Sequence, residues 1–225
     1  MNMFYIIDAE ILGIIALTLR LTFLSTTIAA IIGIPLGLWL DYANFTGKNI
    51  LVVVNRTLMA SPPVVVGLVV YLILMRQGPL GFLGLLFTFE AMVIAQVLLI
   101  TPIVCGIVYT ASQRNSENIR MFAFTMGANK IQTQILLVKE LSNEIFFAVI
   151  TGFGRAMSEV GAIMIVGGNI RHHTRTMTTT ISLLRNRGEI DQAVYLGAIL
   201  MIIAFIVQMA GDFLRRRERR ADENF

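Results

Sequence analysis

The sequence predicts an all-α membrane protein with five membrane-spanning helices. Of its 225 residues, 56% are hydrophobic and only 14% are charged, whereas an average soluble domain is about 25% charged. Five apolar segments each reach the roughly 20 residues that a helix needs to cross a bilayer. A soluble fold of this length would leave too much apolar surface exposed, so we expect one transmembrane domain over residues 1–225.

The first two spans are predicted over Leu12–Leu40 and Leu51–Met75. The second contains Ser61, Pro62 and Pro63 in a row. Pro63 lacks a backbone N–H and clashes with the preceding turn, and Pro62 disfavours helical backbone at Ser61. We therefore expect this span to bend or open at the two prolines.

A break of this kind has two interpretations. Irregular backbone at membrane depth is tolerated inside protein or along a water-filled cavity, and transporters place such breaks at their substrate sites. Ser61, Pro62 and Pro63 are therefore candidates for the pathway or a gate. The alternative is a simple kink at a contact between helices.

The third span is predicted over Phe89–Ala111, and a polar segment with helical patterning follows over residues 113–140. Ser116 can cap the start of a first short helix, and Gly127 would separate it from a second. Taken alone, two short amphipathic helices are also typical of a hairpin lying on the lipid surface.

The fourth span is predicted over Ile145–Val166 and contains Arg155, Ser158 and Glu159. Residues four apart share one face of a helix. A lone charge within a membrane is costly, so we expect Arg155 and Glu159 to pair with each other or across a dimer. These three residues are candidates for a gate or a dimer contact, and the alternative is a static ion pair.

The fifth span is predicted over Ala193–Leu214, directly before a tail, 215–225, with five arginines in positions 215–220. In a five-span topology this tail and the 113–140 segment, which carries four basic residues, lie on the same side. Basic loops remain in the cytoplasm. We therefore expect a cytoplasmic C-terminus and an N-terminus outside the cell membrane.

The segment between the last two spans then lies outside although it is basic. Guanidinium groups suit tetrahedral oxyanions, and positive walls concentrate anions. The candidates for an anion pathway are therefore Asn169, Arg171, Arg175 and Thr178. The alternatives are that these residues dock an external binding protein or that the loop meets lipid headgroups.

Several function classes are excluded by what the sequence lacks. A single cysteine allows no internal disulfide or cysteine metal cluster, and the adjacent His172 and His173 do not predict a metal site. No phosphate-binding Gly-x-x-x-x-Gly-Lys-Ser/Thr motif is present, and no catalytic residues are predicted. The basic residues follow the spans, so a nucleic-acid partner is not expected.

The segment between the third and fourth spans resembles the coupling loop of binding-protein-dependent ABC importer permeases. The family pattern is Glu-Ala-Ala, three residues and then Gly, and this chain reads Met121, Phe122, Ala123 and then Gly127-Ala128. The glutamate and the first alanine are replaced, and Lys139-Glu140 stands where the family has Leu-Pro. The resemblance implies that Phe122, Ala123, Gly127 and Ala128 contact an ATPase subunit.

Two longer stretches carry a more specific resemblance. Ser61-Pro-Pro-Val-Val-Val-Gly-Leu-Val-Val-Tyr71 with Gly78-Pro-Leu-Gly81 is similar to the second span of molybdate and tungstate permeases. The later stretch resembles the tungstate-type permease specifically, in the residues Gly152-Phe-Gly-Arg-Ala-Met-Ser-Glu-Val-Gly-Ala162, Val166-Gly-Gly-Asn-Ile-Arg-His-His-Thr-Arg175 and Met177-Thr-Thr-Thr180.

This resemblance implies the fold of type I importer permeases and a subunit of an oxyanion importer, with tungstate as the expected substrate. It further implies a pathway between two copies of the chain, cytoplasmic ATPase subunits that bind ATP and Mg²⁺, and an external solute-binding protein. No cofactor is expected on this chain. Import of molybdate, sulfate or another oxyanion, an ATP-independent anion channel and a membrane scaffold are the alternatives.

Overall fold

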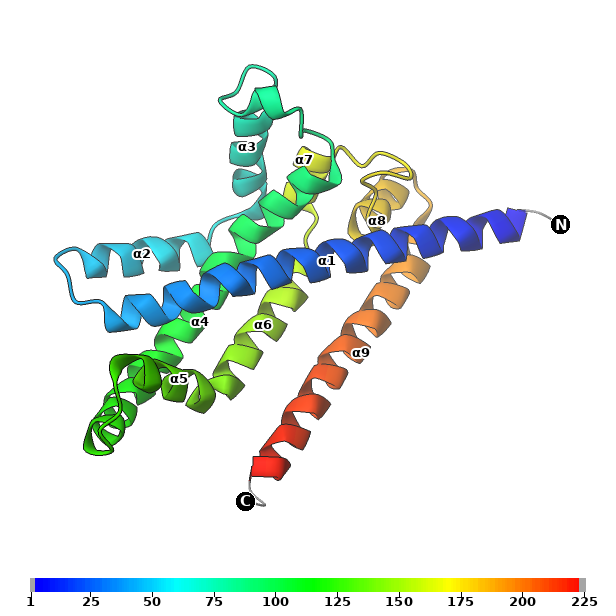
Figure 1. Cartoon of the computed structure of the whole chain (residues 1–225). Coiled ribbons are helices and arrows are strands. Elements are labelled where there is room, and N and C mark those ends of the chain that lie inside the picture. Colours follow the sequence, from blue (N-terminus) through cyan, green and yellow to red (C-terminus); the bar gives the residue numbers. More distant parts are fainter. Residues whose placement is uncertain (1–2, 223–225) are drawn as a thin grey trace.

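A computed structural model describes the backbone of residues 3–222 and, within it, the side chains of 10–211 and 213. Helices are the only regular elements in that range (Figure 1). In chain order they are α1 (Met3–Tyr42), α2 (Lys48–Met59), α3 (Pro63–Leu74), the 3₁₀ helix η1 (Gly81–Leu83), α4 (Phe89–Thr125), α5 (Lys130–Glu140), α6 (Ser142–Met157), α7 (Gly161–Gly167), α8 (Met177–Asn186) and α9 (Ile190–Asp222).

Three of these helices are long and apolar enough to cross a membrane, namely α1, α4 and α9. Two bent pairs pass the same test, α2 with α3 at an angle of 102° and α6 with α7 at 59°. If each bent pair counts as one span, the described part of the chain has the five expected spans. The fourth span is broken as well as the second, which the sequence did not predict.

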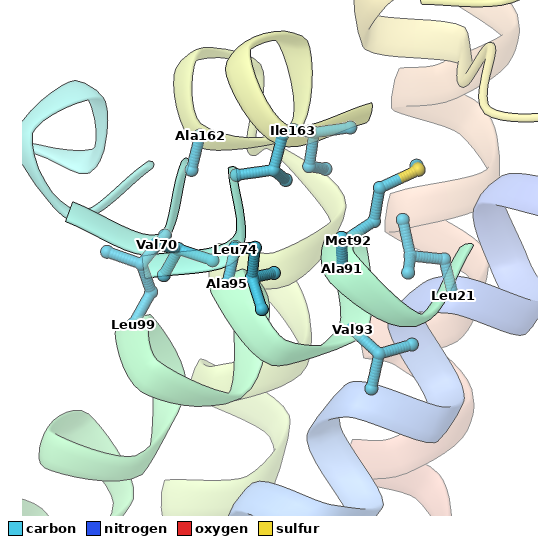
Figure 2. Packing of buried hydrophobic residues seen from close by; sticks show 11 residues of the cluster. Leu21, Val70, Leu74, Ala91, Met92, Val93, Ala95, Leu99, Ala162 and Ile163 are labelled. Atoms are coloured by element: carbon cyan, nitrogen blue, oxygen red, sulfur yellow. The ribbon is translucent and has the colours of Figure 1, made fainter. Parts of the chain in front are cut away.

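The hydrophobic core lies where the two short half-helices α3 and α7 pack against α4 (Figure 2). Val70 and Leu74 of α3 meet Ala162 and Ile163 of α7 over the α4 residues Ala91, Met92, Ala95 and Leu99. Leu21 joins this cluster from α1, which packs against α4 and crosses it at an angle in Figure 1. The small alanine side chains allow the helices to approach closely.

The expected boundary between the third span and the polar segment does not exist. α4 continues without interruption through Ala111 to Thr125, so Ser116 is buried inside a helix and does not cap one. The Ser112 hydroxyl and the Arg120 guanidinium both bond to the carboxylate of Asp41 near the end of α1. These contacts hold the polar part of α4 against α1, and they explain why the helix persists past the apolar stretch.

The segment expected as an external loop contains a further helix, α8. Thr176 caps it, since its hydroxyl accepts from the Thr179 amide while Thr179 bonds back to the Thr176 amide. α8 packs against α9. The backbone of the basic tail is helical up to Asp222 as part of α9, and the last three residues of the tail lie outside the described range.

The contact between the two half-helices yields a prediction about Gly67. A Cβ atom at Gly67 would lie 2.6 Å from the Ala162 Cα atom, so Gly67→Ala forces α3 and α7 apart. We expect this variant to lose about 1–3 kcal/mol of unfolding free energy, as overpacked cores do. The measurement is the unfolding midpoint in detergent.

Gly13→Ala is the matched control, because a Cβ atom at Gly13 of α1 would meet nothing within 4 Å beyond the neighbouring backbone of its own helix. A Gly67→Ala variant as stable as Gly13→Ala would contradict the close packing of α3 on α7.

Candidate functional site

The break in the second span is built by Ser61, Pro62 and Pro63, as their local chemistry predicts. Pro62 is the N-cap of α3 with extended backbone, at φ −63° and ψ 128°, and Pro63 is its first residue. Proline is well suited to that position, because the first helical N–H has no partner within the helix. The Ser61 hydroxyl donates to the Leu58 carbonyl oxygen at 2.7 Å, which closes the end of α2.

The break in the fourth span is centred on Glu159. α6 ends at Met157, and the Glu159 carboxylate accepts a hydrogen bond from the Ala162 amide in the first turn of α7 at 3.0 Å. A carboxylate is favourable there, since the N-terminus of a helix carries partial positive charge. Its side chain is only 3% exposed, so the amide and the nearby Arg155 compensate for its burial.

Arg155 and Glu159 do pair, with 3.7 Å between the Arg155 Nη2 and Glu159 Oε2 atoms. They do not share one helix face, because the helix ends between them. Ser158 lies exposed in the break, and its hydroxyl donates to the Arg155 carbonyl oxygen at 3.0 Å. Arg155 remains 38% exposed, so the pair joins a buried carboxylate to a solvent- or lipid-facing guanidinium.

Thr178 belongs to this break and not to the external arginines with which the sequence grouped it. Its buried hydroxyl donates to the Glu159 carbonyl oxygen at 2.8 Å. The amide of Met177, the first residue of α8, donates to the Thr18 hydroxyl of α1 at 2.9 Å. The start of α8 is thereby fixed between α1 and the break.

The two breaks lie side by side. The site that would be occupied by a Cβ atom on Gly161, the first residue of α7, is 3.6 Å from the Val64 amide nitrogen in the first turn of α3. The starts of α3 and α7 therefore meet, and the hydrogen bond from Thr178 to Glu159 joins α8 to the same place. We name Ser61, Pro62, Pro63, Ser158 and Glu159 the double break.

A second polar cluster surrounds Glu10 of α1, where it meets the segment between α7 and α8. Arg171 donates to both Glu10 carboxylate oxygens, at 2.9 and 2.6 Å, and an Arg175 nitrogen lies 3.7 Å from one of them. Arg175 also donates to the Asn169 carbonyl oxygen at 3.4 Å. The hydrogen bond with Glu10 raises the pKa of Arg171, which stays charged.

The Glu10 cluster, which consists of Glu10, Arg171 and Arg175, borders a cavity of about 630 Å³. The same cavity is also lined by Arg187, Glu189 and Asp191. The Arg175 Nε and Asn169 Oδ1 atoms are buried without a hydrogen-bond partner. The predicted anion candidates Asn169, Arg171 and Arg175 are thus together, but a carboxylate of the chain already neutralises part of their charge. An arriving anion would compete with Glu10 for these donors.

The corner between α4 and α5 is closed by local hydrogen bonds. Gly127 adopts the left-handed conformation at φ 71°. The Ala128 amide donates to the Ala123 carbonyl oxygen at 2.9 Å and the Gly127 amide donates to Phe124 at 3.0 Å, the pattern of a Schellman motif, which favours glycine at this position. Asn129 then starts α5 with a capping box that includes Gln132.

Large apolar side chains are exposed around this corner. Phe124 is 82% exposed, and Ala123 is buried beneath. The exposed members of this corner patch are Met121, Phe122, Phe124, Met126 and Ile131. A patch of this kind marks a surface that binds a partner or a membrane.

The corner is tied to α1 by a buried carboxylate. Asp41 accepts from Arg120 at 2.7 Å and from the Ser112 hydroxyl at 2.9 Å, and its side chain is 5% exposed. Arg120 also lies over the ring of Tyr42, 5.4 Å from its centre. A displacement of the 113–140 segment therefore acts directly on the end of α1.

The sequence of residues 33–220 matches the family described as "Binding-protein-dependent transport system inner membrane component". This chain belongs to that family. The predicted family is thereby confirmed, and the protein is a membrane component of a transport system.

Curated relatives of this permease cover most of its length. "Tungstate uptake system permease protein TupB" of Peptoclostridium acidaminophilum is 44% identical over 89% of this chain and 88% of its own. The protein of the same name in Campylobacter jejuni is 32% identical over 93% of this chain and 87% of its own. "Molybdenum transport system permease protein ModB" of Azotobacter vinelandii is 30% identical over 88% and 92%.

Two polar residues of the permease, Gln96 and Glu10, make contacts that the sequence did not predict, although a polar residue in or beside an apolar span is itself a signal. Gln96 is a polar residue inside the apolar third span, and it is 1% exposed. Its amide donates to the Ala156 carbonyl oxygen at 2.9 Å and its oxygen accepts from Ser25 at 2.7 Å, so it links α1 and α4 to the end of α6. Glu10 is an acidic residue two positions before the predicted first span, and it pairs with Arg171.

No three His, Cys, Asp or Glu side chains gather to hold a metal ion in the part of the permease that the structure describes. His172 and His173 are both exposed.

Proposed function

We propose that this permease is the membrane subunit of an ATP-driven oxyanion importer, that its substrate is tungstate, and that two copies enclose the pathway. The observation that carries the proposal is the 44% identity, over 89% of the chain, to a permease named for tungstate uptake. The relative of the same name at 32% identity supports it. The whole chain, residues 1–225, acts in this proposal as one permease domain.

The proposed topology has the N-terminus outside and the C-terminus in the cytoplasm. Two ion pairs at opposite ends of α1 support it, because each joins segments that the topology places on the same side. Glu10 bonds to Arg171 of the segment assigned outside. Asp41 bonds to Arg120 of the 113–140 segment assigned to the cytoplasm, where basic residues are retained.

The corner patch is the proposed contact with the ATPase subunit, which would bind ATP and Mg²⁺ while this chain binds no cofactor. Phe122 offers an exposed apolar surface next to Phe124, and Gly127 and Ala128 form the turn that presents it. The buried Ala123 supports this turn from inside. ATP binding would move the corner and, through Asp41, the end of α1.

The double break is the proposed gate. Interrupted helices leave backbone groups that water or a substrate can satisfy, and transporters bind their substrates at such places. Glu159 and Thr178 hold the gate in one arrangement through three hydrogen bonds or ion pairs. Movement of α7 relative to α6 would change the backbone exposed there. The alternative is that the Arg155–Glu159 pair only holds the bundle together.

The Glu10 cluster is the proposed external entry, where an oxyanion or the solute-binding protein meets Arg171 and Arg175. Arg171→Gln is expected to lower uptake about tenfold, as loss of a hydrogen bond to a charged group does. Its effect on the unfolding free energy should be small, because the Arg171 side chain is 57% exposed and its ion pair is screened by solvent. Radiolabelled tungstate uptake and thermal unfolding measure the two effects.

Arg185→Gln is the matched control, an exposed arginine on α8 that does not border the cavity. Equal uptake by the two variants would contradict a role of the Glu10 cluster in anion entry. If Arg171→Gln does lower uptake, measuring the affinity of each variant for the solute-binding protein shows whether Arg171 contacts that protein or the oxyanion.

Other oxyanions are the second candidate substrate. A permease named for molybdenum transport is 30% identical to this chain, and one named for sulfate transport in Escherichia coli is 27% identical. The same machinery would serve either ion. An ATP-independent channel has less support, because the corner patch would then lack a partner.

The deciding experiment reconstitutes this chain with its ATPase subunit and binding protein in proteoliposomes and compares tungstate with molybdate and sulfate uptake. Preferential tungstate uptake that requires the ATPase and ATP supports the proposal. ATP-dependent uptake of molybdate or sulfate instead retains the importer and changes the substrate. Uptake without the ATPase indicates a channel, and no uptake by an assembled complex refutes a transport function for any oxyanion.

A further inference from the structure

An apolar groove separates the last turns of α1 from α5. It has a volume of about 600 Å³ and is bordered by Pro35, Leu38 and Trp39 on α1 and by Ile135 and Val138 on α5. On each helix the bordering residues recur every three or four positions and so form one face. These two apolar faces border the groove, and Leu38 also packs against the buried cluster that contains Leu137 of α5.

The position of the groove relates it to the bilayer. Its α1 wall belongs to the segment Glu10–Tyr42, which is long and apolar enough to cross a membrane. Trp39 and Tyr42 are 49% and 46% exposed near the end of that segment, and the Trp39 ring stacks on Phe45 at 5.6 Å. Tryptophan and tyrosine at the end of a span mark the level of the lipid headgroups.

The charge at the groove is positive. Lys130 and Lys139 border it at the two ends of α5, separated by about 14 Å of helix rise. Both lysines are exposed, and neither forms an ion pair with any residue whose side chain is described. Basic pockets between membrane helices bind acidic lipid headgroups, and the spacing lets each lysine meet a separate phosphate.

We propose that this groove binds acidic phospholipid, with acyl chain between α1 and α5 and phosphate at Lys130 or Lys139. The ATPase subunit is a poorer occupant, because the groove extends to Pro35, two turns inside the apolar span. The proposal depends on α1 crossing the bilayer and not on which ion the permease carries. It places a lipid contact directly beside α5, whose Ile131 belongs to the corner patch and also borders the groove.

The chain itself supplies the probe, because Trp39 is its only tryptophan and borders the groove. Bromine on an acyl chain quenches tryptophan fluorescence on contact. We would place the full chain in nanodiscs of phosphatidylcholine with about 20% of either brominated phosphatidylglycerol or brominated phosphatidylcholine. The expected result is stronger quenching by the acidic lipid, with an enrichment at Trp39 of about fivefold for each lysine.

Lys130→Gln and Lys139→Gln should each reduce this enrichment, and the double variant should abolish it. Arg76→Gln with Arg114→Gln is the matched control, since both arginines are exposed and neither borders the groove. Equal quenching by the two brominated lipids, or equal loss in the control, overturns the proposal. Quenching that is independent of lipid charge and removed by added ATPase subunit also overturns it and assigns the groove to that partner.

Discussion

Phe124→Asp is expected to weaken binding of the ATPase subunit by about 30- to 1,000-fold, as loss of an apolar anchor at the centre of an interface does. Phe124 is 82% exposed, so the substitution removes little packing within the chain. Phe122 is 59% exposed beside it, and Phe122→Asp should act in the same direction. Both variants should lose ATP-driven uptake while the unfolding midpoint in detergent is unchanged.

The chain offers a close control in Phe82, which is 80% exposed on η1. η1 precedes the start of α4, whereas the corner patch lies at the end of α4. Phe82 and Phe124 are therefore separated by the full length of that helix. Phe82→Asp should leave ATPase binding intact in a pull-down from detergent. Retained binding by both Phe124→Asp and Phe122→Asp would remove the corner patch from the interface.

Glu159→Ala is expected to lower both stability and uptake. The substitution leaves the Ala162 amide without its acceptor and Arg155 without its partner. Loss of hydrogen bonds to a buried charged group costs about 2 kcal/mol. The same free energy corresponds to a fall in uptake of about 30-fold, if the bond to α7 is needed in the transport cycle.

Glu159→Gln separates the two contributions, because the amide oxygen can still accept from Ala162 while the charge next to Arg155 is lost. We expect it to retain most of the stability and to transport at an intermediate rate. Glu117→Ala controls for loss of an exposed carboxylate on a helix. Thermal unfolding and uptake by Glu159→Ala that both equal those of Glu117→Ala would refute a role for the double break.

The sequence predicted the break in the second span, which is caused by neighbouring residues, but not the break in the fourth span, which depends on a distant contact. In the second span, two prolines forbid a continuous helix whatever surrounds them. The fourth span has no proline near Glu159, and its break is held by the hydroxyl of Thr178, which lies 19 positions further along the chain. A contact of that kind leaves no trace in hydrophobic periodicity, so this span was expected to be one helix.

Distant contacts also explain why some helix ends differ from those that the sequence predicts. Serine is favoured at N-caps, but Ser116 lies inside α4. That part of α4 is held in place by the hydrogen bond from Ser112 to Asp41, which lies 71 positions earlier. In α8 the first residue, Met177, is followed by three threonines, which have low helix propensity. Its capping box uses Thr179 where glutamate or glutamine is usual. Arg171 could be predicted as a candidate anion ligand from its residue type, whereas its partner Glu10 lies 161 positions away and could not be predicted.

The unbroken course of α4 has a geometric consequence. Its 37 residues, which continue through Pro102, form a rod about 55 Å long with the corner patch at one end and the core of Figure 2 at the other. Tilting such a rod by about five degrees around one end moves the other end by about 5 Å. Packed apolar side chains touch at about 4 Å. A small angular change imposed at Phe124 therefore suffices to separate side chains packed on the far end of the same helix.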